Sequence, residues 1–292
     1  MELQQMRYVI AVAETNNFTR AAQRCLVVQS ALSHQIARLE KELGARLFER
    51  TSRRVRLTAA GAAFLPAARQ CLEAAERAAA EVAAAVGEVR GRLTVGLIPT
   101  VAAVDLPSVL KDFHRRHPKA RVSLSVGASE DLVEQVRKGE IEVAFLGIPV
   151  TARLPRGVHA RELARERLIA VVSPAHPLAG ESSVDLRRLA SEVFVDLPAK
   201  TAGRAQSDLA FAAAGLTREV AFEVTNADYL ARLVGAGLGV ALLPPTYVAD
   251  LAGVTTIEVT DAPARVEYVV WGRESRTPAA AAFLELLGIE EE

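Results

Sequence analysis

Small and polar side chains gather on one face of a helix that is predicted to begin at Ser30. At about 100° per residue, Ser30, His34 and Arg38 lie opposite the apolar stripe of this helix, and Ser33 lies on its flank. Their polar groups can hydrogen-bond to base edges in the major groove of DNA, as can the amide of Gln29 just before the helix. The first ten residues of the helix carry no acidic side chain, which favours a face turned toward a polyanion.

Two shorter elements must position this face. An apolar repeat at three- and four-residue steps predicts a first helix over residues 3–13, which ends at the polar run 15–17. Thr19 is the predicted N-cap of a second helix over residues 20–26, and a tight turn leads into the third helix, which stops at Gly44. Two short helices joined by a tight turn predict a helix-turn-helix, whose last helix enters the major groove.

Arginines dominate the segment that follows the third helix. Apolar residues at 47–48, and again at 55 and 57, predict two short strands around a polar tip, which is the pattern of a wing. Five arginines lie between Arg46 and Arg56, with Glu49 as the one acidic residue among them. The wing is therefore predicted to place guanidinium groups near phosphates or in a minor groove.

The charge distribution agrees with a DNA-binding head. The 292-residue chain has zero formal net charge, yet residues 1–58 hold ten Lys and Arg against five Asp and Glu. Its length and apolar content predict two or three compact units, each with its own core. A basic head on an acidic body indicates that one end of the molecule meets a polyanion.

Four blocks of this N-terminal region resemble the LysR-type transcriptional regulators: LQQMRYV (3–9), NFTRAAQRCL (17–26), QSALSHQIARLE (29–40) and LGARLFER (43–50). The resemblance implies a sequence-specific regulator whose DNA binding responds to a small-molecule effector. The DNA-binding residues expected from the pattern and the resemblance together are Thr19, Arg20, Gln29, Ser30, Ser33, His34, Arg38, Arg50, Arg53 and Arg54. The family often has Pro at the position of Ser30 and Arg at that of His34, so the preferred bases are expected to differ from the common pattern.

A long helix is predicted over residues 59–90, with Thr58 as its N-cap. Small and apolar side chains recur at three- and four-residue steps along it, close to the spacing of a helix seam, although Pro66 interrupts the pattern. A helix of about 45 Å is longer than one small domain needs. It is therefore predicted to form a homodimer that reads a DNA site with dyad symmetry, and the resemblance implies a dimer of dimers.

Short apolar runs alternate with amphipathic helices over residues 91–292, which predicts an α/β domain with largely parallel sheets. The resemblance implies two Rossmann-like subdomains, similar to periplasmic binding proteins. Subdomain I is expected at about 91–150 and 265–292, and subdomain II at about 151–264. Segments LVGAGLGVALLP (233–244) and HPLA (176–179) also resemble the effector domain of this family.

Polar residues that follow strands and precede helices are the candidates for effector binding, since ligands of such sheets lie beyond the carboxyl ends of the strands. Thr100, Ser129, Thr201 and Asn226 are expected to cap helices, bind a ligand, or do both. The predicted effector site consists of Pro99, Thr100, Val101, Ser129, Gly147, Thr201 and Asn226. Lys200 or Arg204 is a further candidate that could neutralise an anionic effector.

Other classes of function have little support in the sequence. The run at 235–239 lies between a helix and a strand, whereas a dinucleotide fingerprint needs the opposite order. No catalytic motif or metal-ligand set is recognised, so an enzyme, a resident cofactor and a metal centre are not expected. Cys25 and Cys71 lie outside the sensor region, and no membrane segment is predicted, which favours a cytoplasmic protein of the bacterial nucleoid.

Two questions stay open from the residues alone. The first is whether the α/β body binds a ligand, or whether the chain is a ligand-independent architectural DNA-binding protein whose body only oligomerises. The second is which partners it has besides DNA, a second copy of itself and the effector; RNA polymerase is a further candidate for a regulator of this kind.

Overall fold

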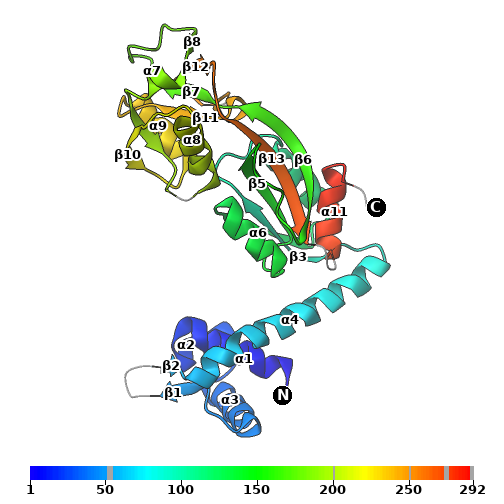
Figure 1. The fold of residues 1–292 in the computed structure, drawn as a ribbon. Helices are drawn as coiled ribbons and strands as arrows, with labels where there is room; N and C mark the ends of the chain where they lie inside the picture. Colours follow the sequence, from blue (N-terminus) through cyan, green and yellow to red (C-terminus); the bar gives the residue numbers. More distant parts are fainter. Residues whose placement is uncertain (51–54, 200, 250, 273–275, 290–292) are drawn as a thin grey trace. The chain divides into compact units, whose positions relative to one another are not determined.

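The computed structural model describes residues 1–292 except 51–54, 200, 250, 273–275 and 290–292. The chain divides into two compact units, Met1–Gly87 and Glu88–Glu292. The first unit contains three helices, a two-stranded wing and a long helix, and the second contains two α/β lobes (Figure 1).

Three helices pack around the core of the first unit: α1 (Leu3–Thr15), α2 (Phe18–Arg24) and α3 (Gln29–Leu43). The predicted stripe of α3 is buried, with Leu32, Ile36 and Leu39 fully inside. The predicted N-cap of α2 was wrong, because the Asn17 side chain rather than Thr19 accepts the hydrogen bond from the backbone N–H of Arg20. Asn and Thr are both good caps, and the cap position is set by where the chain leaves α1.

The wing consists of β1 (Phe48–Arg50) and β2 (Val55–Leu57), which pair antiparallel as the sequence predicts. Glu40 anchors the wing to α3, since its carboxylate accepts hydrogen bonds from the backbone N–H groups of Leu47 (2.8 Å) and Phe48 (3.2 Å). This contact gives the acidic residue of the last turns of α3 a structural role. The predicted contacts Arg53 and Arg54 lie outside the described residues.

Helix α4 (Ala59–Ala85) extends as a rod beyond the head of its unit (Figure 1). The Thr58 side chain caps it as predicted, accepting from the backbone N–H of Gly61, and the helix continues through Pro66. It ends about a turn before the predicted boundary at residue 90. Val82 is 69% exposed in the single chain, so the distal part of the predicted seam is available to a partner.

The first lobe of the second unit is built on a five-stranded sheet of order β4-β3-β5-β13-β6. Strands β3, β4 and β5 run parallel, while β13 runs antiparallel to β5 and to β6. The strands and the helices that belong to this lobe are β3 (Gly91–Leu97), α5 (Leu106–Arg116), β4 (Ala120–Val126), α6 (Ser129–Arg137), β5 (Val143–Pro149), β6 (Val158–Arg167), β13 (Ala264–Gly272) and α11 (Pro278–Leu286).

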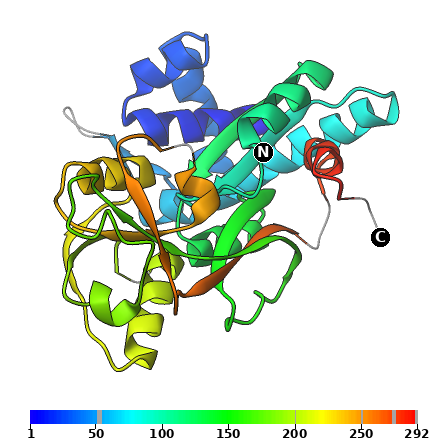
Figure 2. The same ribbon diagram turned by 90° about the horizontal axis from the view of Figure 1, so that it is seen from above.

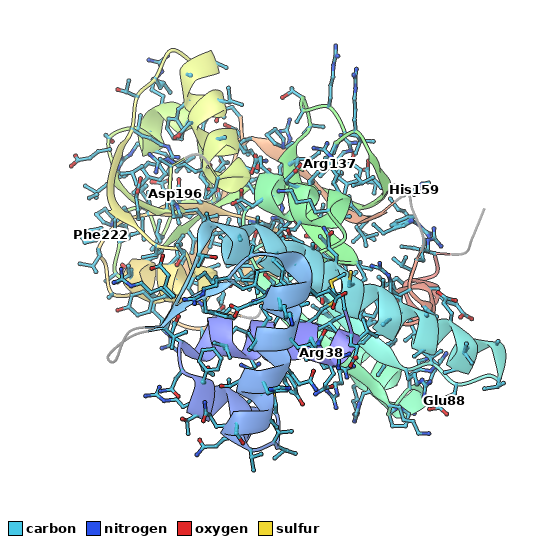
Figure 3. The ribbon with its side chains drawn as sticks, turned by 90° about the horizontal axis from the view of Figure 1, so that it is seen from below. Arg38, Glu88, Arg137, His159, Asp196 and Phe222 are labelled. Atoms are coloured by element: carbon cyan, nitrogen blue, oxygen red, sulfur yellow. The ribbon has the colours of Figure 1, made fainter. Side chains whose placement is uncertain are left out.

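The second lobe has a four-stranded sheet of order β11-β7-β12-β8 and a parallel pair β10-β9, joined by a bridge between Phe194 and Val240. Asp196 and Phe222 belong to this lobe, and Arg137 and His159 to the first (Figure 3). The elements of the second lobe are β7 (Ile169–Val172), β8 (Ser183–Val184), α7 (Leu186–Leu189), β9 (Val193–Asp196), α8 (Ala202–Ala213), β10 (Glu219–Glu223), α9 (Ala227–Gly235), β11 (Ala241–Leu243), α10 (Pro245–Val248) and β12 (Thr255–Val259).

The two lobes are joined by long strands rather than by loops (Figures 1 and 2). The first crossing was expected near residue 151, but β6 still pairs with β13 in the first sheet, so the chain enters the second lobe at Leu168. The expected boundary of subdomain II is therefore too early. Strand β6 is an edge strand rich in charged residues, and its sequence lacks the apolar run that identifies a buried strand.

Candidate DNA-binding face and effector cleft

The outer face of α3 presents the polar groups that the sequence predicts. Gln29, Ser30, His34 and Arg38 are exposed and Ser33 is half-buried. The Gln29 amide Nε2 donates a 2.8 Å hydrogen bond to the Ser33 hydroxyl oxygen, which orders the amide at the start of the helix. The two side chains therefore form a fixed pair of hydrogen-bonding groups on this face.

The start of α3 has an unusual composition for a capped helix. Val28 is at the N-cap and provides no side-chain acceptor, so the first-turn N–H groups lack the usual capping partner.

The other predicted DNA contacts lie on α2, on α3 and in the wing. Thr19 and Arg20 are exposed at the start of α2, and the Arg38 guanidinium is 4.0 Å from the Glu2 carboxylate. That pair is largely solvated, so it leaves Arg38 available. Arg50 lies in β1.

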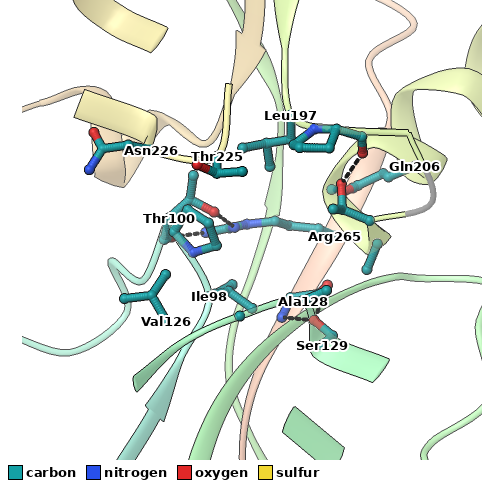
Figure 4. A pocket seen from close by; sticks show the side chains of 17 residues that line it. Ile98, Thr100, Val126, Ala128, Ser129, Leu197, Gln206, Thr225, Asn226 and Arg265 are labelled. Carbon is teal, nitrogen blue, oxygen red and sulfur yellow. Dashed lines mark hydrogen bonds between the residues drawn. The ribbon is translucent and has the colours of Figure 1, made fainter. Parts of the chain in front are cut away.

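A cavity of about 380 Å³ lies between the two lobes of the second unit (Figure 4). Six of the seven predicted effector residues line it: Pro99, Thr100, Ser129, Gly147, Thr201 and Asn226. The structure thus brings together residues that are up to 127 positions apart in the chain (99 to 226). Val101 was placed wrongly, since it lines a neighbouring cavity instead and packs against the core of the first lobe.

Each polar residue of the cavity wall is held by a local contact. The Ser129 hydroxyl donates to the Gly147 carbonyl (3.1 Å) and accepts from the Gly147 N–H (3.2 Å), so Ser129 bridges α6 to β5 rather than capping its own helix. Thr201 caps α8 and Asn226 caps α9, as predicted. Thr100 caps no helix, because the next helix, α5, begins at Leu106 and has Asp105 as its N-cap.

Arg265 is the charged centre of this wall. Arg265 is 4% exposed, and its guanidinium donates to the Thr100 hydroxyl oxygen (2.7 Å) and to the Thr100 carbonyl (3.0 Å). It also pairs with the carboxylates of Glu166 at 2.9 Å and Glu267 at 3.0 Å. Figure 4 shows the arginine reaching Thr100 from its strand. Because Glu166 is on β6 and Arg265 and Glu267 are on β13, one side chain ties Thr100 to both strands that connect the lobes.

Gly147 leaves little room for a side chain at this point of the cavity wall. A Cβ atom there would lie 2.7 Å from Ile98 Cδ1 and 3.3 Å from Arg265 Nη1. A larger residue would therefore have to displace the side chains of Ile98 and Arg265.

Burial raises the pKa of the Glu267 carboxyl, although Arg265 and the backbone N–H groups of Ala102 and Ala103 act in the opposite direction. The side chain is fully buried, and desolvation disfavours its charged form. With two carboxylates on one guanidinium, the Arg265 cluster carries no surplus positive charge.

Gln206 is a cavity residue that sequence reasoning missed. It lies on α8, four residues after Ala202, and both line the cavity. The residue is 4% exposed, and its amide Nε2 is buried with no hydrogen-bond partner among the described residues. The position one turn after a lining residue was the only signal in the sequence that could have found it.

Arg204 was a wrong candidate, because it does not line the cavity. Its guanidinium is bound to Asp208 at 3.0 Å, to Glu223 at 3.0 Å and to the Leu197 carbonyl at 3.3 Å. Lys200 lies outside the described residues. Arg265 was also missed: it is a cation in an apolar strand, two residues from an acidic residue on the same face, and that pattern could have indicated a buried ion pair.

Two further observations concern metal ions and membranes. Among the described residues, no group of three His, Cys, Asp or Glu side chains could hold a metal ion. In the same part of the chain, none of the helices has the length and apolar character needed to span a bilayer.

The fold and the two sites define a class: a winged helix-turn-helix with a long helix, followed by a two-lobed α/β domain whose cavity lies between the lobes. Two family models match the chain, the bacterial regulatory helix-turn-helix protein of the lysR family over residues 3–62 and the LysR substrate binding domain over residues 87–290. The protein belongs to the LysR family of transcriptional regulators.

Relatives and solved structures agree with this assignment. The chain is 31% identical to the regulator BudR of Raoultella terrigena, covering 98% of this chain and 100% of that one. It is 37% identical to the regulator ShiR of Corynebacterium glutamicum over 83% of this chain and 82% of that one. Full-length CbnR in complex with its target DNA has a TM-score of 0.76 at 30% identity, with 99% of each chain covered. The protein is therefore a DNA-binding transcriptional regulator with a C-terminal effector-binding domain.

Proposed function

We propose that a small-molecule effector binds the cavity between the lobes and alters how the winged helix-turn-helix binds its DNA site. The observation that supports this proposal is the convergence of Thr100, Ser129, Thr201 and Asn226 from four separate strand ends on one cavity. A cavity of about 380 Å³ falls in the size range of small-molecule sites. The Arg265 cluster lies on both connecting strands and contacts Thr100 of the cavity wall. Through this contact, a ligand in the cavity would change the relative position of the two lobes.

The proposed DNA partner is a duplex with dyad symmetry. A homodimer that forms through α4 binds it, and two such dimers associate into a dimer of dimers. In this reading Gln29, Ser30, Ser33 and His34 contact bases. Thr19, Arg20, Arg38, Arg50 and the wing arginines Arg53 and Arg54 contact the backbone or a minor groove. The proposed setting is the bacterial cytoplasm at the nucleoid, with RNA polymerase as a further partner and no catalytic activity.

Substitution of Gln29 by Ala tests the base contacts. We expect binding to the preferred site to weaken about 10- to 100-fold, because one base-edge contact is worth about 1–3 kcal/mol, while binding to random DNA stays unchanged. The preferred site is first selected from a random duplex library with the wild-type protein, and binding is measured by fluorescence anisotropy at fixed salt. Gln70→Ala on the exposed side of α4 is the matched control. An equal loss on random DNA would contradict the base-contact assignment.

Filling the cavity tests the effector site. Ala128 lines the cavity, so the Ala128→Leu variant should abolish the rise in melting temperature that an effector gives the wild-type protein, while Ala212→Leu on α8, outside the cavity lining, should not. A ligand at 100 times its Kd stabilises by about 2.7 kcal/mol, a shift of roughly 5 °C or more. The probes are carboxylates, amino acids, aromatic acids and sugar phosphates, with DNA binding measured in parallel. If no compound shifted the wild-type protein, the ligand-independent architectural protein would be the better description.

A further inference from the structure

The described lining of the cavity has hydrogen-bond donors, but its one cationic side chain is already paired with carboxylates. The one cation in the described lining is Arg265, and two carboxylates already neutralise it, at 2.9 Å and 3.0 Å. Behind the other wall, Arg218 and Arg204 share the carboxylates of Asp196, Asp208 and Glu223. Within the described residues, these two clusters hold three guanidinium groups and five carboxylates.

The pairing of these guanidinium groups determines which ligands the cavity favours. An anion placed beside Arg265 would be desolvated without gaining an unpaired cation among the described lining residues, which is costly. An uncharged ligand avoids that cost and can still accept hydrogen bonds from the wall.

Gln206 provides a hydrogen-bond donor that the described residues do not use. The residue is 4% exposed and lines the cavity, and its buried Nε2 has no partner among the described residues. A buried amide without a partner costs free energy, commonly about 1–3 kcal/mol. Such a cost is recovered when a ligand supplies the missing acceptor, after rotation of the amide where needed.

Thr100 offers a second donor on the opposite lobe. Its hydroxyl oxygen accepts a 2.7 Å hydrogen bond from Arg265, and no described residue accepts the proton of the hydroxyl itself. Thr100 is 6% exposed and lines the same cavity. A ligand that accepts from both Thr100 and Gln206 would connect the first lobe to α8 of the second lobe.

We propose that the effector is an uncharged molecule with an apolar body and a carbonyl oxygen, as in an amide, ketone or ester, and that Gln206 selects this oxygen. This inference rests on the proposed function, because it assumes that the cavity is the effector site. The remaining lining fits an apolar body, since Ile98, Val126, Leu197 and Pro198 surround the polar groups.

Matched ligand pairs test the proposal directly. The probes are benzamide and benzoate, cyclohexanecarboxamide and cyclohexanecarboxylate, and hexanamide and hexanoate, extended to further pairs on the same plan. Each is measured by thermal shift and by calorimetry on the full-length wild-type protein, on Gln206→Leu and on Gln135→Leu, a matched change on α6 outside the cavity lining. We expect each carboxamide that binds the wild-type protein to do so with higher affinity than its carboxylate. The Gln206→Leu variant should weaken carboxamide binding about tenfold or more, while Gln135→Leu should leave the affinity unchanged.

The unliganded melting temperature separates a ligand contact from a structural role. Leucine has about the volume of glutamine and needs no partner, so Gln206→Leu should melt at the wild-type temperature or above it. A lower melting temperature would show that Gln206 supports the fold, and would overturn the proposal.

The remaining outcomes are distinct from one another. Preference for carboxylates, or carboxamide binding that survives in Gln206→Leu, would overturn this inference and leave the effector cavity in place. The same holds if only charged members of the wider set of compounds bind. If no compound of either set binds the wild-type protein, the proposed function fails and this inference fails with it.

Discussion

The Arg265→Met variant is expected to lose roughly 3–5 kcal/mol of unfolding free energy in the effector-binding domain. Removal of the guanidinium leaves the carboxylates of Glu166 and Glu267 without a cation, and Glu267 is fully buried. It also removes the donor to Thr100. Urea unfolding followed by circular dichroism measures the loss. Arg165→Met on the neighbouring strand β6, where the arginine is exposed, should cost less than about 1 kcal/mol.

The pH dependence of this variant provides an independent check. Burial already raises the pKa of Glu267 above its unfolded value, and without Arg265 the pKa rises further. The folded state then holds the proton more tightly than the unfolded state, so the stability of the variant should fall as the pH rises from about 5 to 8. The double variant Arg265→Met with Glu267→Gln should recover part of the loss and flatten this slope. A variant as stable as the wild type at pH 8 would contradict the role given to the ion cluster.

The Gly61→Val variant is expected to weaken both the fold of the head and its DNA binding. A Cβ atom at Gly61 would lie 2.1 Å from the Leu47 carbonyl oxygen and 2.9 Å from Leu57 Cδ2, far inside van der Waals contact. The start of α4 and the base of the wing would have to separate, at a cost of about 3 kcal/mol or more. Because the wing begins at Phe48, next to Leu47, its placement should change and affinity for a selected DNA site should fall more than tenfold.

Thermal unfolding and fluorescence anisotropy measure the two effects of Gly61→Val. Gly180→Ala is the matched control, since a Cβ there meets nothing within 4 Å and the residue has no positive φ. It should change neither quantity. Wild-type DNA affinity in Gly61→Val would show that the contact between α4 and the wing does not set the DNA-binding geometry.

The sequence alone predicted most of the first unit and two helix caps of the second, because these signals are local. The buried stripe of α3, its end at Gly44 and the caps Thr58, Thr201 and Asn226 each depend on residues within a few positions of one another. Asn17 and Thr19 are both good N-cap residues and lie close together, and the prediction of Thr19 as the cap of α2 was wrong. Five of the six lining residues that were predicted share the same property, since each follows a recognisable strand, while Gly147 lies within β5.

Only the tertiary structure decided the features that depend on distant pairing. Strand β6 exists because β13, about a hundred residues later, pairs with it, and its own charged sequence gives no strand signal. Arg265, Glu166 and Thr100 become one cluster only when the two connecting strands lie beside the first lobe. The amide nitrogen of Gln206 lacks a partner among the described residues because of how α8 packs, not because of its neighbours in sequence. Periodicity and capping are local free energies that a sequence displays, whereas burial and ion pairing belong to the folded arrangement, which decided the chemistry of the cavity.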